Sequence, residues 1–228
     1  MTKISIILPI FNEANGIEPT LYGLQPFRAE GHEVIVVDGG SRDDSALLSI
    51  PLADRVITAE RSRSRQMNAG AEMAKGDILL FLHGDTFLPK EATQRIIHGI
   101  EKKGRNWGRF DVRLSGKHPI LRAVELFMNW RSRLTGIATG DQAIFVRRDL
   151  FESIGGFPEI SLMEDIALSK ILKRYGPPLC LRERVLTSSR RWENNGVIRT
   201  IFHMWYLRLA YFMGADPNHL ALMYRPTR

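Results

Sequence analysis

Several features that mark common protein classes are missing from this sequence. The 228 residues include one cysteine, Cys180, so an internal disulfide and a cysteine metal cluster are both excluded. No run of about 18 uncharged apolar residues occurs, which argues against a membrane-spanning helix. The N-terminus lacks a basic segment followed by a long apolar one, so we expect no signal peptide and a cytoplasmic chain.

The chain carries more positive than negative charge, but its basic residues are not clustered in one segment. The chain has a net charge of +7, which is compatible with nucleic acid, an anionic membrane face or an anionic small substrate as partner. The arginines occur in small groups along the chain, without a long basic arm, a zinc finger or an aromatic RNA-binding motif. We therefore expect no nucleic-acid partner, and favour an anionic substrate or a membrane face.

Strands and helices alternate in the first part of the chain. Apolar runs predict strands at Lys3–Ile10, Glu33–Asp38, Asp54–Thr58 and Ile78–Leu82. Helical spacing predicts helices at Glu18–Arg28, at a short segment ending at Ser49, and from a cap at Ser62 or Ser64 to about Lys75. This alternation is typical of a parallel sheet with helices on its faces.

Polar residues follow the predicted strands where they end. Asn12 and Glu13 leave the first strand, Asp38 leaves the second, and His83 and Asp85 leave the fourth. The carboxyl edge of such a sheet is where α/β proteins bind ligands, and carboxylates can accept hydrogen bonds from a base or a ribose. The first exit loop has neither the Gly-x-Gly-x-x-Gly pattern nor a Walker loop, which argues against dehydrogenases and phosphate-loop ATPases.

The second part of the chain has a different pattern but no linker-like composition. We predict helices at Lys90–Lys102, Pro119–Leu134, Asp149–Ile154 and Leu162–Tyr175, and strands at Asn106–Leu114, Ala138–Arg147 and Arg184–Ser189. The strand at Asn106–Leu114 is interpreted as antiparallel. Both parts are expected to form one compact domain.

Three segments together resemble the family 2 glycosyltransferases: ISIILPIFNEANGI, VIVVDGGSRDDS and RSRQMNAGAEMAKGDILLFLHGDT. The resemblance implies a glycosyltransferase A-type α/β fold, with a mostly parallel central sheet and helices on both faces. It places a nucleotide-sugar-binding half at 1–86 and an acceptor half at 87–192, within one domain of residues 1–192. It implies an enzyme that moves a sugar from a nucleotide-diphosphate donor to an acceptor hydroxyl.

The resemblance also implies site residues. Those expected to contact the nucleotide sugar are Pro9, Asn12, Glu13, Asp38, Gly39, Arg61, Arg65, Asn68, Gly84 and Asp141. Asp85 matches the second aspartate of the family's Asp-x-Asp motif, so it is expected to hold Mn²⁺ or Mg²⁺, whereas the first aspartate is His83 here. His83 is either a second ligand, which would suit Mn²⁺, or a hydrogen-bonding neighbour.

The segment RRDLFESIGGFPEISLMEDIALSKIL resembles the family segment that ends in a Glu-Asp pair. The resemblance assigns Asp165 as the catalytic base and Glu164 as its neighbour. Because one base suffices and no second nucleophile is evident, we expect a single displacement with inversion. Arg61 and Arg65 stand four residues apart and would bind the diphosphate from one helix face, with Arg65 favoured. Asp141 contacts a substrate or only fixes a turn.

The C-terminal segment, residues 193–228, contains a predicted helix at Val197–Met213 that is apolar around most of its circumference. We interpret it as a peripheral membrane contact at the inner face, with a lipid-linked acceptor, or alternatively as a helix that covers the domain or forms a homodimer. Two other functions stay open: a non-catalytic nucleotide-sugar-binding protein and a nucleotidyltransferase.

Overall fold

A computed structural model describes residues 2–224 of the chain. The strands are β1 (Ile4–Ile10), β2 (Glu33–Asp38), β3 (Arg55–Thr58), β4 (Ile78–Phe81), β5 (Thr86–Phe87), β6 (Trp107–Leu114), β7 (Phe145–Arg147) and β8 (Leu179–Thr187). The α-helices are α1 (Ile17–Ala29), α2 (Ser45–Ser49), α3 (Arg63–Glu72), α4 (Ala92–Glu101), α5 (Pro119–Thr135), α6 (Arg148–Ser153), α7 (Glu164–Leu172), α8 (Arg190–Asn195), α9 (Val197–Phe212) and α10 (Pro217–Met223). Short 3₁₀ helices lie at Ile50–Leu52 (η1), Gly140–Gln142 (η2) and Lys173–Tyr175 (η3).

The strands form one sheet in the order β3-β2-β1-β4-β7-β6-β8-β5. The first four strands in this order, from β3 to β4, run parallel to one another. β7 is antiparallel to the strands on both its sides, and β6 is parallel to β8. The predicted fold class, a mostly parallel sheet with helices on both faces, is confirmed. The carboxyl ends of β1, β2, β4, β6 and β8 therefore meet at one edge.

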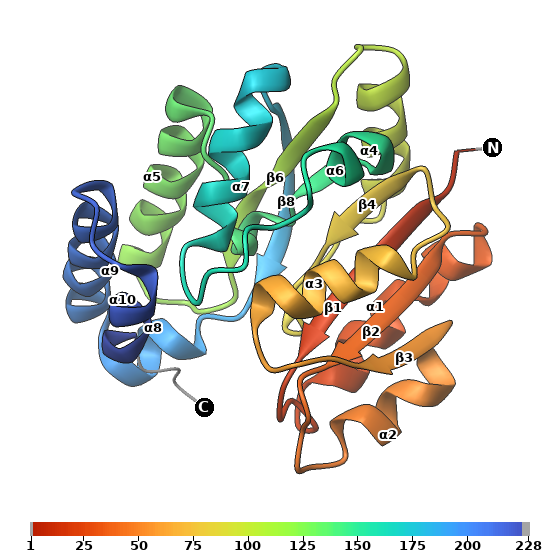
Figure 1. The fold of residues 1–228 in the computed structure, drawn as a ribbon. Coiled ribbons are helices and arrows are strands. Elements are labelled where there is room, and N and C mark those ends of the chain that lie inside the picture. Colours follow the sequence, from red (N-terminus) through yellow and green to blue (C-terminus); the bar gives the residue numbers. More distant parts are fainter. Residues whose placement is uncertain (1, 225–228) are drawn as a thin grey trace.

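Alternation along β1 explains why both faces of the sheet are covered. Ile4, Ile6, Leu8 and Ile10 pack in one apolar cluster with α1, α4 and α5, whereas Ile7 packs in another with α3, α6 and α7. Successive side chains of a strand point to opposite faces, so a continuous apolar run requires helices on both. Figure 1 shows α3 crossing in front of β1 and β2, with α1 behind them.

Several predicted boundaries in the second part are wrong. The segment predicted as a strand from Ala138 turns instead through η2, where the Thr139 and Gln142 side chains form a capping box, and β7 begins only at Phe145. The last strand starts at Leu179, five residues before the predicted Arg184. β6 is antiparallel to β7 over two residue pairs, but it pairs in parallel with β8 from Gly108 to Leu114, with a register shift after Phe110.

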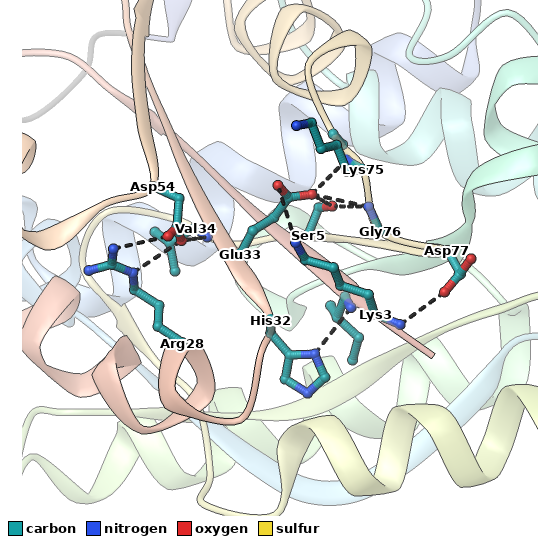
Figure 2. Close-up of polar contacts among 12 residues, drawn as sticks. Lys3, Ser5, Arg28, His32, Glu33, Val34, Asp54, Lys75, Gly76 and Asp77 are labelled. Carbon is teal, nitrogen blue, oxygen red and sulfur yellow. Dashed lines mark hydrogen bonds and ion pairs between the residues drawn. The ribbon is translucent and has the colours of Figure 1, made fainter. Parts of the chain in front are cut away.

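A buried carboxylate joins strands and loops at the opposite edge of the sheet (Figure 2). Glu33 accepts hydrogen bonds from Ser5 Oγ at 2.5 Å, from Lys75 N at 2.6 Å and from Gly76 N at 3.1 Å. A cavity of about 300 Å³ also lies near this edge, beside Asp77 and Arg148, and none of the predicted site residues lines it. The Glu33 carboxylate thus connects β1, β2 and the loop before β4 at this edge.

The C-terminal helices pack on the second part of the domain through a small set of side chains. Leu207 of α9 and Leu220 of α10 form a cluster with Met163 and Ile166, next to the start of α7. In α9 only Thr200 and Leu207 are fully buried, and half of the apolar side chains of this helix are exposed. Figure 1 shows α9 beside α5, and the rings of Phe127 and Trp205 meet there with centroids 5.6 Å apart.

Candidate functional site

A cavity of about 450 Å³ opens at the carboxyl edge of the sheet. Its walls come from the loops after β1 and β4, the start of α3, η2, the start of α7, and helices α8 to α10. The predicted site residues that line it are Pro9, Glu13, Arg61, His83, Gly84, Asp85, Asp141, Glu164 and Asp165. Those outside its lining are Asn12, Asp38, Gly39, Arg65 and Asn68.

The polar groups of Asn12 and Asp38 are engaged by their own loops. Asp38 is 5% exposed, and its carboxylate accepts from Gly40 N at 3.0 Å, from Ser41 N at 2.9 Å and from the Ser41 hydroxyl. Asn12 accepts from Arg42 N at 2.9 Å through Oδ1. The Asp38 bonds fix the exit loop of β2, and the bond from Arg42 N to Asn12 joins that loop to the exit loop of β1.

The start of α3 decides which arginines reach the cavity. Because the helix begins at Arg63, Arg65 turns outward, where it pairs with Glu159 at 3.1 Å and with Glu60. Arg61 precedes the helix and lies over the Phe11 ring, 3.9 Å from its centroid, at the cavity wall.

Asn68 holds the loop that leads to the acceptor half. Its amide donates to Phe157 O and accepts from Phe157 N, both at 2.9 Å. The side chain therefore positions the segment before α7 from outside the cavity.

Asp85 faces a cation across the cavity mouth. Arg190, at the start of α8, donates to Glu13 Oε2 at 3.2 Å, and its Nη2 lies 3.7 Å from Asp85 Oδ2. Arg190 thus connects the exit loops of β1 and β4 to the C-terminal part of the chain. A ligand cation at Asp85 would have to compete with this guanidinium.

His83 is turned toward η2. Its Nδ1 lies 3.3 Å from Asp141 Oδ1, and its Nε2 faces Gly140 so closely that a Cβ there would come within 2.5 Å. Burial raises the pKa of Asp141, but the hydrogen bond from His83 and its charge outweigh this and hold the pKa below its usual value. Both ring nitrogens are thus directed at the Gly140–Asp141 segment.

Glu164 and Asp165 begin α7, where the preceding Met163 takes a left-handed conformation at φ 69°. Asp165 Oδ2 accepts from Gly140 N at 2.8 Å, which joins α7 to η2. A carboxylate at a helix start is also favoured by the helix dipole. The carboxyl group is therefore held in one orientation at the cavity wall.

Glu164 lies in an apolar and negatively charged setting. It is 7% exposed, and burial, followed by the charge of Asp165, raises its pKa to about 7, against the opposing charge of Arg63. Burial alone would lower the pKa of Arg63, but the neighbouring Tyr224, Glu164, Asp141 and Asp165 raise it above its usual value. Arg63 therefore adds positive charge beside the acidic groups of this wall.

Glu164→Gln should change how stability depends on pH. A carboxyl group whose pKa rises on folding stabilises the fold fully below its unfolded pKa, and this contribution is lost as pH rises through about 7. The free energy of unfolding of the variant, relative to wild type, should therefore increase by on the order of 2 kcal/mol between pH 5 and pH 8. Urea denaturation at several pH values measures this. Glu72→Gln, at an exposed position, is the control, and parallel pH profiles of wild type and Glu164→Gln would contradict the assignment.

The residues present offer limited support for a divalent metal. Within residues 2–224, no group of three or more His, Cys, Asp or Glu side chains gathers to hold an ion. Asp85 presents a carboxylate at the cavity mouth, where its nearest charged neighbour is Arg190. Such a site fits a hard cation that takes most of its ligands from phosphate oxygens and water.

Several cavity residues carry no signal in the sequence. Arg190 and Arg208 come from helices far along the chain, and only the packing of α8 and α9 brings them to the cavity. Arg63 lies between Arg61 and Arg65 in the sequence, and it lines the cavity because α3 begins at this residue. Gln66 donates to Ile10 O and Val37 O, both at 2.8 Å, and so clamps the ends of β1 and β2.

Comparison with known proteins identifies a family to which the chain is similar. Residues 5–155 match the family described as Glycosyl transferase family 2. Glycosyltransferase AglE of Haloferax volcanii is 27% identical over 170 residues, which cover 68% of this chain and 56% of that protein. The undecaprenyl-phosphate 4-deoxy-4-formamido-L-arabinose transferase of Pseudomonas fluorescens is 27% identical over 110 residues, 43% of this chain and 32% of that protein. The chain spans about half the length of the curated relatives it matches first.

A solved structure shares the fold. The mannosyltransferase PcManGT from Pyrobaculum calidifontis, in complex with GDP-Man and Mn²⁺, superposes with a TM-score of 0.67 at 20% identity, covering 100% of this chain and 66% of that one. The fold is thus the glycosyltransferase A type. In the described part of this chain, no helix has the length and apolar character needed to cross a bilayer.

Proposed function

Because the chain belongs to glycosyl transferase family 2, we propose that it transfers a sugar from a nucleotide-diphosphate donor to an acceptor hydroxyl with inversion, with the help of a divalent metal. The observation that carries the proposal is that Asp85, from the nucleotide-binding half, and Asp165, from the acceptor half, line one cavity together with several arginines. A donor and an acceptor bound from the two halves would meet between these carboxylates.

Each group then has a role in a single displacement. The acceptor oxygen attacks the anomeric carbon as the bond from that carbon to the diphosphate oxygen breaks, and the bonding electrons leave with the diphosphate. Asp165 takes the proton of the acceptor hydroxyl, since its carboxylate is oriented by the Gly140 N–H. Arg61 and Arg190 stabilise the charge that grows on the leaving diphosphate.

Asp85 would hold the metal, whose positive charge would lie beside the donor phosphates. His83 orients Asp141 rather than serving as a second ligand, because both of its ring nitrogens face η2. Asp141 then faces the part of the cavity in which the donor sugar would bind. Asp38 and Asn12 act through the loops they hold, and Arg65 and Asn68 through the segment before α7.

A donor screen tests the proposal. The protein is incubated with several nucleotide sugars and Mn²⁺, and the released product is identified. Nucleoside diphosphate is the expected product. Release of pyrophosphate would indicate a nucleotidyltransferase instead. If the protein binds a nucleotide sugar but releases no product with any acceptor tested, it is a non-catalytic binding protein.

We also propose that the exposed face formed by α5 and α9 contacts an anionic bilayer, so that the acceptor is lipid-linked. Its exposed apolar side chains are Leu126, Phe127, Trp130 and Leu134 of α5, and Ile198, Phe202, Trp205, Tyr206, Leu209 and Phe212 of α9. This many exposed apolar side chains on two neighbouring helices are typical of an interaction surface. The net charge of +7 and the exposed Arg199 complement anionic lipid rather than a second copy of this chain.

Vesicle sedimentation should show this contact. Wild type is expected to sediment at low salt with phosphatidylcholine vesicles that contain about one third phosphatidylglycerol, and a Phe202→Glu/Trp205→Glu variant should bind roughly tenfold or more weakly. Leu47→Glu, at an exposed apolar position on α2, is the control. If wild type ignores the vesicles but elutes as a dimer that Phe202→Glu/Trp205→Glu dissociates, the face is a homodimer interface instead.

A further inference from the structure

Arg190 holds its guanidinium group against the carboxylate that is proposed to bind the metal. Its Nη2 donates to Glu13 Oε2 at 3.2 Å and lies 3.7 Å from Asp85 Oδ2. Its Nε donates to the Ser188 hydroxyl at 3.3 Å. Glu13 follows β1 and Asp85 follows β4, so this one cation joins both exit loops to the start of α8.

The Arg190 side chain can leave this position without unpacking the protein. It is 58% exposed, and its two carboxylate partners are 33% and 34% exposed. Its backbone is held separately, because the preceding Ser189 N donates to Ser115 Oγ at 3.1 Å. Exposed ion pairs contribute little to stability, since water screens them. A ligand that offers better acceptors can therefore draw the guanidinium away.

A guanidinium group and a divalent cation beside the same carboxylate repel each other. Asp85 carries one negative charge, and Arg190 already lies next to it. A diphosphate changes this balance because it brings further negative charge and several acceptor oxygens. Those oxygens can accept from a guanidinium group and can also complete the shell of a hard cation.

We propose that Arg190 acts as a switch that makes metal binding at Asp85 depend on the donor. The inference rests on the proposed function, since it requires a metal at Asp85 and a diphosphate in the cavity. In the free protein, the Arg190 guanidinium pairs with Glu13 and repels a cation from Asp85. When the nucleotide diphosphate enters, the guanidinium turns to the phosphate oxygens and leaves Asp85 free for the metal. Metal and nucleotide therefore bind together.

Titration of Mn²⁺ followed by electron paramagnetic resonance tests the switch, with UDP, GDP and dTDP as the nucleotide probes. Without nucleotide, Arg190→Gln should bind Mn²⁺ roughly two- to fivefold more tightly than wild type, because a neighbouring positive charge is removed. With nucleotide, and after correction for Mn²⁺ bound by nucleotide alone, the same variant should bind Mn²⁺ on the order of tenfold more weakly, because the diphosphate loses a charge-assisted partner. A residue that only holds the fold would not reverse the sign. Arg190→Lys keeps the charge and should resemble wild type without nucleotide.

Three controls locate the effect at Asp85. Arg61→Gln should weaken nucleotide binding without tightening the binding of Mn²⁺ alone, because Arg61 lies over the Phe11 ring. The gain in Arg190→Gln should disappear when Asp85→Asn is added, since the site that gains is then lost. Arg184→Gln, exposed on β8 outside the cavity, should match wild type in both titrations. The melting temperature of Arg190→Gln should stay near that of wild type, because the replaced side chain is exposed.

The outcomes distinguish the switch from the proposed function. Equal affinity of wild type and Arg190→Gln for Mn²⁺ alone would overturn the switch, even where wild type releases nucleoside diphosphate from a donor. Binding of the nucleotide by wild type that is as tight in EDTA as with Mn²⁺ would also overturn it, and would make Arg190 a lasting substitute for the metal. If no probe binds wild type, the switch is likewise wrong. If the reversal of sign is found but wild type releases no product from any donor, the switch stands and the proposed transfer fails.

Discussion

Asp165→Asn is expected to lower the turnover number for sugar transfer by roughly 10²–10⁴-fold, because the amide cannot take the proton of the acceptor hydroxyl. The geometry should survive, since the asparagine Oδ1 can still accept from Gly140 N, as Asp165 does at 2.8 Å. Single-turnover release of nucleoside diphosphate, with the donor and acceptor found by screening, measures the effect.

Binding of donor should separate this loss from a folding defect. Thermal stabilisation by the nucleotide sugar is expected to be similar in wild type and Asp165→Asn. Asp149→Asn alters an exposed carboxylate that pairs with Arg147 at 2.5 Å, away from the cavity, and should keep normal transfer. Near-normal transfer by Asp165→Asn would show that another group is the base, and Glu164, with a pKa of about 7, would be the first to test.

Asp85→Asn should weaken Mn²⁺ binding at least on the order of tenfold and lower transfer in parallel, because Asp85 is the one carboxylate that the proposal gives to the metal. Arg190 Nη2, 3.7 Å from Asp85 Oδ2, opposes a cation in the free protein. Mn²⁺ should therefore bind much more tightly with nucleoside diphosphate than without it. Electron paramagnetic resonance titration of Mn²⁺ measures both effects.

Two further variants sharpen the metal test. His83→Ala should leave the Mn²⁺ affinity nearly unchanged, since the His83 ring contacts Asp141 and Gly140. Asp44→Asn, at an exposed position outside the cavity, is the matched control. A loss of Mn²⁺ affinity in His83→Ala as large as in Asp85→Asn would make His83 a direct ligand. Mn²⁺ affinity that does not respond to nucleotide would contradict a site completed by phosphate oxygens.

Much of the fold could be predicted from the sequence because its central strands are buried on both faces. The runs at Ile4–Ile10 and Glu33–Asp38 are apolar almost without interruption, and their ends match the structure closely. The elements that were missed are short. β5 has two residues and α8 and α10 have six and seven, too few to show a period, and tertiary packing rather than local preference holds them.

The position of the candidate site could be predicted from the sequence, but not which side chains enter its cavity. Strand ends locate Asp85, and a family segment locates Asp165, since topology brings these ends to one edge. Whether a side chain enters the cavity depends on local bonds that composition does not reveal. Asp38 is occupied by its own loop, and Arg65 turns away because α3 begins two residues before it. Arg208 arrives from far along the chain and has no local signal.

The close approach of His83 to Gly140 links two positions that are 57 residues apart in the chain. A Cβ at position 140 would lie 2.5 Å from the imidazole, so this backbone accepts the ring only where residue 140 has no side chain. In a set of related chains, the two positions should therefore covary, with histidine at 83 accompanied by glycine at 140. A chain with the shorter aspartate at 83 should tolerate alanine at 140, and Gly140→Ala should be better accepted after His83→Asp than before it.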